Sequence, residues 1–449
     1  STIDQADINV MDERIDQGAN LLKNHVFQFD FLNDDFSKLP QSLQEIINNP
    51  VKRKKLLIYI NPPYAEADNR TGEGRKGVAV SEIHKKYSDK MGYTKREMYI
   101  QFLTRIYVEI PEAVIANFST LKNLQAPRFK DFRRFYRAKL EKIFLTPAKT
   151  FDNVKGTFPI GFFIWDTKKE EDFEFIEADV YGNKAEYIGT KNIWGFDNFK
   201  FINDWVKTFR ITNSESLATI IGVGSDFQNQ RLVRFGEPFM KVPASNHNWQ
   251  TSKDNLIETS IYYTVRRIID ANWLNDRDQF LWPKDLWKTG FEFQNDCLTH
   301  TLFSNNISNG FVINNWIPFT EEEINAQEKF ESNFMTDFIN GKIKIENETN
   351  LFGTNENQIV KREFSEEAKT VFNAGRKLWK YYHSKPNVNV NASLYDIREY
   401  FQGRNDKGRM NSKSDDEKYM ELIGELRKKL NFLADKIKPK IYEYEFLKL

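Results

Sequence analysis

The stretch Leu56-Leu-Ile-Tyr-Ile60, followed at once by Asn61-Pro62-Pro63-Tyr64, decides the fold class that this sequence predicts. A continuous apolar run of this kind is typical of a parallel strand that is buried on both faces. In an open α/β sheet, ligands bind beyond the carboxyl ends of such strands. The tetrapeptide therefore occupies the place where a site is expected.

The residues Asn61 to Tyr64 suit chemistry on the amine of a nucleobase. Such an amine is a poor nucleophile because its lone pair is delocalised into the ring. The side-chain oxygen of Asn61 and the carbonyl oxygen of Pro62 can accept its N–H bonds and help the nitrogen become tetrahedral. Pro62 and Pro63 stiffen the loop, and Tyr64 offers a flat face to a base swung out of the duplex. A simple strand-ending turn is the alternative, since Asn and Pro are common in turns.

Residues 1–170 alternate strand-like and helix-like patterns, which indicates a layered α/β sheet. Apolar runs predict further strands at His25-Val-Phe-Gln-Phe29, Ala113-Val-Ile-Ala-Asn-Phe118 and Phe162-Phe-Ile-Trp165. From Arg96 to Ile110, apolar side chains spaced four apart predict a helix.

The rest of the chain divides into two regions. Residues 171–345 hold short strands, with a hairpin around Tyr181-Gly182-Asn183, and we expect an α+β target-recognition region. Residues 346–449 begin with a polar, Asn-rich linker and continue as a helical segment. The last helix carries apolar side chains three and four apart, which predicts packing against the helix around Ala368 to Tyr381. A dimerising coiled coil is the alternative, although fewer than about three heptads are sustained.

Composition narrows the class of protein. A chain of 449 residues is too long for one simple core, so two or three domains are expected. The single cysteine, Cys297, cannot form an internal disulfide and fits a reducing, cytoplasmic setting. Apolar runs long enough to span a membrane are missing from the sequence. The five scattered histidines predict no metal site.

Positive charge is concentrated between residues 128 and 142, where basic and aromatic side chains are interleaved. Five of these basic side chains could neutralise DNA phosphates: Arg128, Lys130, Arg133, Arg134 and Arg137. Farther along, three arginines could contact guanine edges: Arg266, Arg267 and Arg277. For each of these side chains, a salt bridge within the protein is an equally good interpretation.

Asn61-Pro62-Pro63-Tyr64 resembles the catalytic motif of amino-group DNA methyltransferases of the class I S-adenosylmethionine-dependent fold. The Asn form of the motif implies methylation of adenine N6. Asp4 resembles the acidic residue at the end of the second strand of that family, and would bind the ribose hydroxyls of the cofactor. Asp30 and Phe31 resemble the next motif, in which Asp30 would hold the adenine amine of the cofactor and Phe31 would pack on its ring.

The resemblance covers about 170 residues and implies a Rossmann-like methyltransferase sheet, S-adenosyl-L-methionine as cofactor and double-stranded DNA as substrate. Beyond it, the stretches 273–280 and 315–319 are similar to long single-chain adenine methylases of bacterial restriction–modification systems. A restriction subunit is therefore an expected partner, and we expect a cytoplasmic, nucleoid-associated protein. Two alternatives stay open: a methyltransferase acting on a release-factor glutamine or a ribosomal RNA base, and a non-catalytic DNA-binding fragment.

One motif of that family has no counterpart before Asp4, namely the Gly-rich loop after the first strand that cradles the methionine part of the cofactor. The later stretch Ile221-Gly222-Val223-Gly224-Ser225-Asp226 is a weak candidate, which we interpret as a turn. We therefore expect a truncated methyltransferase sheet, with the first strand and its loop missing and cofactor binding weak or absent.

Overall fold

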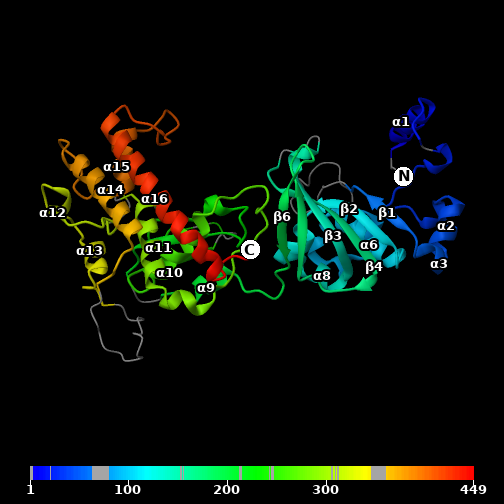
Figure 1. Cartoon of the computed structure of the whole chain (residues 1–449), viewed down its shortest axis with the longest axis horizontal. Coiled ribbons are helices and arrows are strands. Elements are labelled where there is room, and N and C mark those ends of the chain that lie inside the picture. The colour runs from blue at the N-terminus through cyan, green and yellow to red at the C-terminus, as the bar shows by residue number, and fades with distance from the viewer. Residues whose placement is uncertain are drawn as a thin grey trace. The chain divides into compact units, whose positions relative to one another are not determined.

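The computed structural model describes residues 4–20, 22–62, 80–151, 154, 156–211, 215–241, 243, 247–304, 307–308, 310, 313–344 and 361–449. The chain forms two compact units (Figure 1). Unit 1 comprises Ser1–Asn198 and Asn272–Arg277, and unit 2 comprises Phe199–Ala271 and Asp278–Leu449. Among the described residues, no helix is both long and apolar enough to cross a membrane.

Unit 1 is built on a six-stranded mixed sheet with the strand order β1-β2-β4-β3-β5-β6. Its strands are β1 (Leu57–Ile60), β2 (Val114–Thr120), β3 (Ala138–Pro147), β4 (Pro159–Glu170), β5 (Phe175–Tyr181) and β6 (Tyr187–Trp194). β1 runs parallel to β2, β4 runs antiparallel to both β2 and β3, and β5 runs parallel to β3. The fold of this unit is therefore α/β with a mixed rather than purely parallel sheet.

The helices of unit 1 are mostly short. They are α1 (Gln5–Asp16), α2 (Gln41–Asn48), α3 (Pro50–Arg53), α4 (Glu82–Lys86), α5 (Ser88–Met91), α6 (Met98–Glu109), α7 (Lys122–Gln125) and α8 (Lys130–Phe135). α6 supplies Ile100, Leu103 and Ile106 to the core, where they share one cluster with Ile115 and Phe163 of the sheet. All five side chains are fully buried, and each such burial contributes about 1.5–3 kcal/mol.

Most predicted elements around the motif are confirmed. The apolar runs beginning at residues 56, 113 and 162 form β1, β2 and β4, and the helix predicted from residue 96 is α6. The strand predicted at 25–29 is wrong, because His25 ends a 3-10 helix and Gln28 forms a lone bridge instead of a ladder. Phe29 is buried in the core, so the apolar run at that point belongs to a packed loop.

The hairpin predicted around residues 181–183 is present as β5 and β6, but it belongs to the sheet of unit 1. β5 pairs with β3 through Phe144↔Asp179 and Leu145↔Val180. Ala178 of β5 is buried in the core of the same unit. The boundary expected at residue 170 therefore falls inside unit 1, and the chain leaves this unit at Asn198.

Unit 2 combines a small antiparallel sheet with helices. The sheet has the order β8-β7-β9, with β7 (Ala218–Gly222), β8 (Arg234–Gly236) and β9 (His247–Thr251). The helices are α9 (Ile202–Lys207), α10 (Leu256–Arg267), α11 (Phe291–Ser304), α12 (Glu321–Ile324), α13 (Phe334–Ile339), α14 (Glu366–His383), α15 (Leu394–Gln402) and α16 (Glu417–Glu443). One hydrophobic cluster extends from Ile202 to Leu447. The C-terminal helical segment is thus part of this unit and not a separate region.

Short 3-10 helices connect the larger elements of both units. They are η1 (Lys23–His25), η2 (Phe36–Lys38), η3 (Gly92–Arg96), η4 (Pro127–Phe129), η5 (Ala148–Thr150), η6 (Gln230–Leu232) and η7 (Asp285–Thr289).

α16 has the apolar face that its spacing predicts. Tyr419, Leu422, Ile423, Leu426 and Leu433 are buried in the shared cluster, and α16 packs against α14. The packing partner expected from the sequence is therefore confirmed. Most of the linker predicted at 344–361 lies outside the described residues.

Candidate functional site

The carboxyl end of β1 continues directly into Asn61 and Pro62. Asn61 is exposed and Pro62 is buried. Because β1 and β2 are parallel, with Ile60 opposite Asn117, both strands end at the same edge of the sheet. A polar residue thus stands at the edge where α/β sheets bind ligands. Pro63 and Tyr64 lie outside the described residues.

A second polar side chain, which the sequence analysis did not single out, lies just beyond the same edge. Asn123 in α7 follows the end of β2 by three residues and is only 2% exposed. Neither its amide nitrogen nor its amide oxygen has a hydrogen-bond partner among the described residues. Since buried polar atoms are nearly always paired, this side chain has donor and acceptor capacity to offer a bound group.

Three phenylalanine rings form a row on one face of the sheet. Phe118, Phe162 and Phe144 stand opposite one another on β2, β4 and β3, with ring centroids 4.8 Å and 5.1 Å apart. Phe163 faces the core shared with α6, and neighbouring strand residues point to opposite faces. The half-buried row therefore lies on the face turned away from α6, and only the strand register reveals it.

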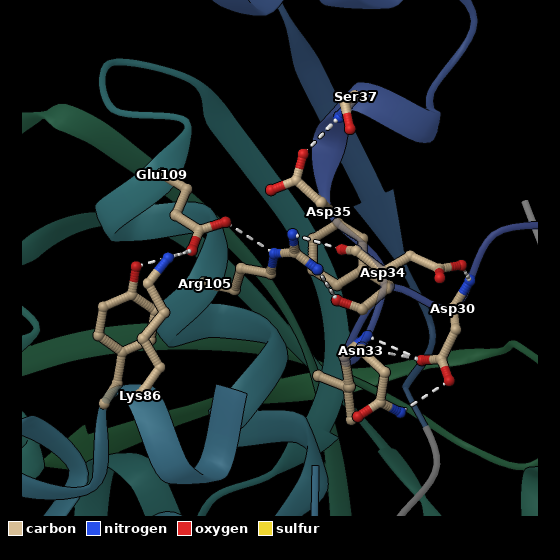
Figure 2. Close-up of polar contacts among 11 residues, drawn as sticks. Asp30, Asn33, Asp34, Asp35, Ser37, Lys86, Arg105 and Glu109 are labelled. Atoms are coloured by element: carbon tan, nitrogen blue, oxygen red, sulfur yellow. Dashed lines mark hydrogen bonds and ion pairs between the residues drawn. The ribbon is translucent and has the colours of Figure 1, made fainter. Parts of the chain in front are cut away.

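Asp30 organises the loop that the resemblance links to the cofactor (Figure 2). Its Oδ1 accepts hydrogen bonds from the backbone N–H groups of Leu32 (3.0 Å) and Asn33 (3.2 Å), and its Oδ2 accepts one from the Asn33 amide (2.7 Å). These bonds form a turn that ends the extended segment. Asp30 therefore has a local structural role, whatever else it binds.

Phe31 lies against α6. Its ring stacks on the ring of Phe102 with 5.2 Å between centroids and 6° between planes. The residue is half-buried, so it lies at the surface of unit 1. The structure thus places Asp30 and Phe31 side by side in one loop anchored to α6.

Arg105 of α6 anchors this loop. Its side chain is 4% exposed and donates to Glu109 Oε2 at 2.8 Å, to the carbonyl of Asp34 at 2.8 Å and to the carbonyl of Phe31 (Figure 2). The guanidinium carbon also lies 4.1 Å from the ring centroid of Phe36. A buried cation thus joins the 30–37 loop to the helix that covers the sheet.

Glu109 neutralises the charge of Arg105 and accepts hydrogen bonds from three side chains. Burial would raise the pKa of Glu109, but hydrogen bonds from Lys86, Tyr87 and Arg105 outweigh it and hold the pKa below its ordinary value. The Lys86 ammonium and the Tyr87 hydroxyl each lie 2.7 Å from Oε1. The carboxylate therefore stays ionised and fixes the orientation of Arg105.

Asp4 is the N-cap of α1. Its Oδ1 accepts a hydrogen bond from the backbone N–H of Ala6 at 2.8 Å, and the residue is exposed. The strand expected before it falls on residues 1–3, which lie outside the described residues. The structure therefore shows Asp4 as a helix cap.

The basic cluster at 128–142 is largely engaged within the protein. Arg133 is buried, forms an ion pair of 2.6 Å with Asp197, and donates to the carbonyls of Asn123 (3.0 Å) and Ala126 (3.1 Å). These bonds occupy its guanidinium, so Arg133 is not available to a phosphate. For this residue the salt-bridge interpretation is the one that fits.

The other four basic side chains have weaker ties. Two of them form ion pairs: Arg137 pairs with Glu170 and Asp172, and Arg134 pairs with Asp131. The other two donate hydrogen bonds: Lys130 to the carbonyl of Asp197, and Arg128 to the Tyr93 hydroxyl. The interleaved aromatics Phe129, Phe132 and Tyr136 are buried. The cluster thus runs from η4 through α8 into the start of β3, and its exposed charges are partly neutralised within the protein.

Arg266 is fully buried in unit 2 and cannot reach a base edge. It donates to the carbonyls of Gly224 (2.8 Å) and Asp226 (3.2 Å), and burial lowers its pKa. Its bonds hold the segment that follows β7. A Cβ on Gly222, the last residue of that strand, would lie 2.3 Å from the Tyr262 hydroxyl. Packing therefore requires the glycine at position 222, whereas a Cβ on Gly224 would come no closer than 3.7 Å to the side chain of Asp226.

Three solved structures are similar to parts of this chain. A modification subunit of a type I restriction enzyme from Vibrio vulnificus YJ016 is 11% identical, with a TM-score of 0.23 over 32% of this chain and 35% of that chain. A nuclease-deletion mutant of the Type ISP restriction-modification enzyme LlaGI in complex with a DNA substrate mimic is 12% identical, with a TM-score of 0.27 over 44% and 24%. The ATP-dependent Type ISP restriction-modification enzyme LlaBIII bound to DNA is 12% identical, with a TM-score of 0.24 over 53% and 18%.

These neighbours are all restriction–modification enzymes, and the matched parts span 35% or less of each. Scores of this size do not establish a common fold, so they carry no argument about the reaction. No family model matches the sequence, and no curated protein matches it.

Proposed function

We propose that this chain is a DNA methyltransferase of a bacterial restriction–modification system, which transfers a methyl group from S-adenosyl-L-methionine to the N6 amine of adenine. The observation that carries the proposal is Asn61-Pro62 at the carboxyl end of β1, beside the parallel strand β2. This is the edge where a substrate and a cofactor can meet. The activity, the substrate and the partners of the whole protein are part of the proposal.

The reaction needs acceptors more than a base. Asn61 presents a side-chain oxygen and Pro62 a backbone carbonyl at adjacent positions, and two such acceptors can draw the electron density of an amine out of the ring as it attacks. Pro62 has a fixed φ and is buried, so its carbonyl is held in place before the substrate arrives. Tyr64 would stack on the extruded base.

Asn123 is suited to recognition of the same base. It lies three residues beyond the end of β2 and offers an unpaired amide donor and acceptor among the described residues. An Asn amide can pair with the edge of an adenine through both groups. We infer that this side chain contributes to the target pocket.

The residues that the resemblance links to the cofactor are partly suited to bind it. S-adenosyl-L-methionine supplies the methyl group when bound. A carboxylate has about four lone-pair sites, and described donors from Leu32 and Asn33 take three at Asp30. One acceptor site is therefore left for an adenine amine, with Phe31 alongside for the ring. Asp4 would bind the ribose hydroxyls.

For DNA contact, we keep Arg128, Lys130, Arg134 and Arg137 as candidates and leave out Arg133, because its donors are used inside unit 1. Contacts of this kind position DNA without reading its sequence. Recognition of the sequence would fall to unit 2.

Replacing Asn61 tests the proposal. In the complete protein, Asn61→Ala should lower methyl transfer about 10²–10³-fold, because one preorganised acceptor is lost, while binding of duplex DNA is retained. Asn61→Asp keeps an acceptor oxygen of the same shape and should retain more activity than Asn61→Ala. The assay is N6-methyladenine in DNA treated with each variant.

Normal adenine methylation by Asn61→Ala would contradict the proposed role of this residue. Methylation of a release factor or of ribosomal RNA, with no methylated site in genomic DNA, would replace DNA as the substrate. Duplex binding without methylation of any substrate by the complete protein would leave only a DNA-binding role.

A further inference from the structure

α16 carries a glycine that the packing of the protein does not explain. Gly424 is the eighth residue of this helix of 27 residues and lies on its exposed side. Glycine is the least favourable helix residue after proline. A Cβ at this position would meet no atom within 4 Å, so the inside of the protein does not require its absence.

Gly375 in α14, by contrast, is a glycine that the packing inside the protein requires. A Cβ there would lie 2.3 Å from the ring of Phe303, which is buried. Gly375 therefore makes room for a neighbouring side chain. Gly424 makes room on the solvent side, which is the use of glycine where another molecule approaches the backbone closely.

An exposed aromatic side chain shares the face of Gly424. Positions 424, 428 and 432 are spaced four apart and so form one row along the helix. The side chain of Phe432 is 49% exposed. The ammonium groups of Lys428 and Lys429 lie 5.9 Å and 6.0 Å from its ring centroid. An apolar ring surrounded by cations is thus presented to solvent.

The cations next to Gly424 differ from the other lysines of α16 in lacking acidic partners. Arg427, Lys428 and Lys429 form no ion pair with any described residue, in contrast to the lysines elsewhere on the helix. Those pairs are Lys418–Glu421, Lys438–Asp435 and Lys440–Glu443, at 2.7–2.8 Å, and Lys436 pairs with Asp296 at 3.0 Å.

The acidic residues nearest to this row are also satisfied. Glu425 pairs with Lys377 of α14 at 3.2 Å, Glu421 with Lys418 at 2.7 Å and Asp435 with Lys438 at 2.8 Å. The three unpaired cations therefore leave a local excess of positive charge. Figure 1 shows α16 beside α14, against which it packs.

We propose that the Gly424 surface, defined as Gly424, Arg427, Lys428 and Phe432, binds the sugar–phosphate backbone of duplex DNA. Arg427 and Lys428 would each neutralise a phosphate, and Phe432 would pack against a deoxyribose. Gly424 lets the strand approach the helix. The inference rests on the proposed function only in that DNA is the substrate, and it concerns a different surface from the edge at Asn61.

Binding by the full chain to a fluorescent duplex of about 30 base pairs, without cofactor and over about 50–200 mM salt, tests the proposal. In Arg427→Gln/Lys428→Gln, the slope of log affinity against log salt should be shallower by about 1.8, because about 0.9 is lost for each phosphate contact. The matched control is Lys438→Gln/Lys440→Gln on the same helix, for which the slope should not change.

Gly424→Ala distinguishes an effect on DNA binding from an effect on stability, because the two should change in opposite directions. Alanine should raise the melting temperature of unit 2 by about 2–4 °C, and yet weaken duplex binding at least about fivefold if the strand passes close to the helix. Phe432→Ala should weaken binding without changing the salt slope.

Equal affinity and equal salt slope in all these variants would overturn the proposal, and capture of a protein partner by the same surface would replace it. Asn61→Ala keeps the two proposals apart. If the complete protein with Asn61 intact binds DNA through the Gly424 surface but methylates no substrate, the proposed reaction is contradicted and the role of the Gly424 surface is supported. Normal DNA methylation, together with binding that does not depend on the Gly424 surface, would support the proposed reaction and contradict the role of this surface.

Discussion

Replacing Arg105 by methionine tests whether the candidate cofactor loop depends on α6. The change keeps the bulk of the side chain but removes three described hydrogen bonds, to Glu109, Asp34 and Phe31. Breaking one side of a buried ion pair costs about 3–5 kcal/mol. Glu109 keeps bonds of 2.7 Å from Lys86 and Tyr87, so we expect the lower end, about 3 kcal/mol.

Hydrogen exchange measured by mass spectrometry gives a local answer. Residues 30–37 should exchange about a hundredfold faster in Arg105→Met, if their opening is controlled by this anchor. Peptides from α14 in unit 2 serve as the internal reference and should not change.

A double-mutant cycle with Glu109→Gln should show a coupling of about 1–3 kcal/mol between the two side chains. Unchanged exchange in residues 30–37, together with a loss of less than about 0.5 kcal/mol on urea unfolding, would refute the view that Arg105 holds this loop.

Two further predictions concern unit 2. Burial lowers the pKa of His300 from 6.5 to about 3, so the unfolded chain binds a proton that the folded chain does not, and stability falls as the pH drops from 6.5 towards 3. In His300→Asn, the unfolding free energy should therefore depend less steeply on pH than in the wild type, by about 1.4 kcal/mol per pH unit over this range. Urea titrations at several pH values measure this slope, and the same slope in both proteins would contradict the prediction. Gly375→Ala should destabilise the unit by about 1–3 kcal/mol through the clash with Phe303, despite the better helix propensity of alanine, and thermal melting at wild-type temperature would contradict this.

The sequence predicts best where one physical signal dominates. β1 is an uninterrupted apolar run, and α6 and α16 repeat their apolar residues at helical spacing, so hydrophobic periodicity alone predicts them. The strand expected at 25–29 was wrong because its apolar residues pack as a loop, fixed by the side chain of Asp30 and by Arg105 from far along the chain. Such a contact, made across more than 70 residues, has no local signal.

Side-chain roles were harder to predict than elements. The charge run at 128–142 gives no indication that Arg133 points inward to Asp197 while Arg134 points to solvent. Asn123 looks like an ordinary polar residue until its burial and missing partners are known. The motif at Asn61 could be found from sequence because its chemistry is contained in consecutive residues, whereas the Phe118, Phe144 and Phe162 row exists only through the strand register.

The segment Asn272–Arg277 shows why a boundary read along the chain cannot describe this fold. It lies 73 residues after the chain first enters unit 2, yet Trp273 and Leu274 pack against the core of unit 1. Asn272 caps the turn by accepting a hydrogen bond from the Leu274 N–H at 2.8 Å. The chain therefore crosses between the units three times, and a cut at residue 198 would remove part of the apolar surface that unit 1 buries. If unit 1 holds the catalytic edge, its stability depends on a segment embedded in the region proposed to recognise DNA, so the two functions cannot be separated by simple truncation.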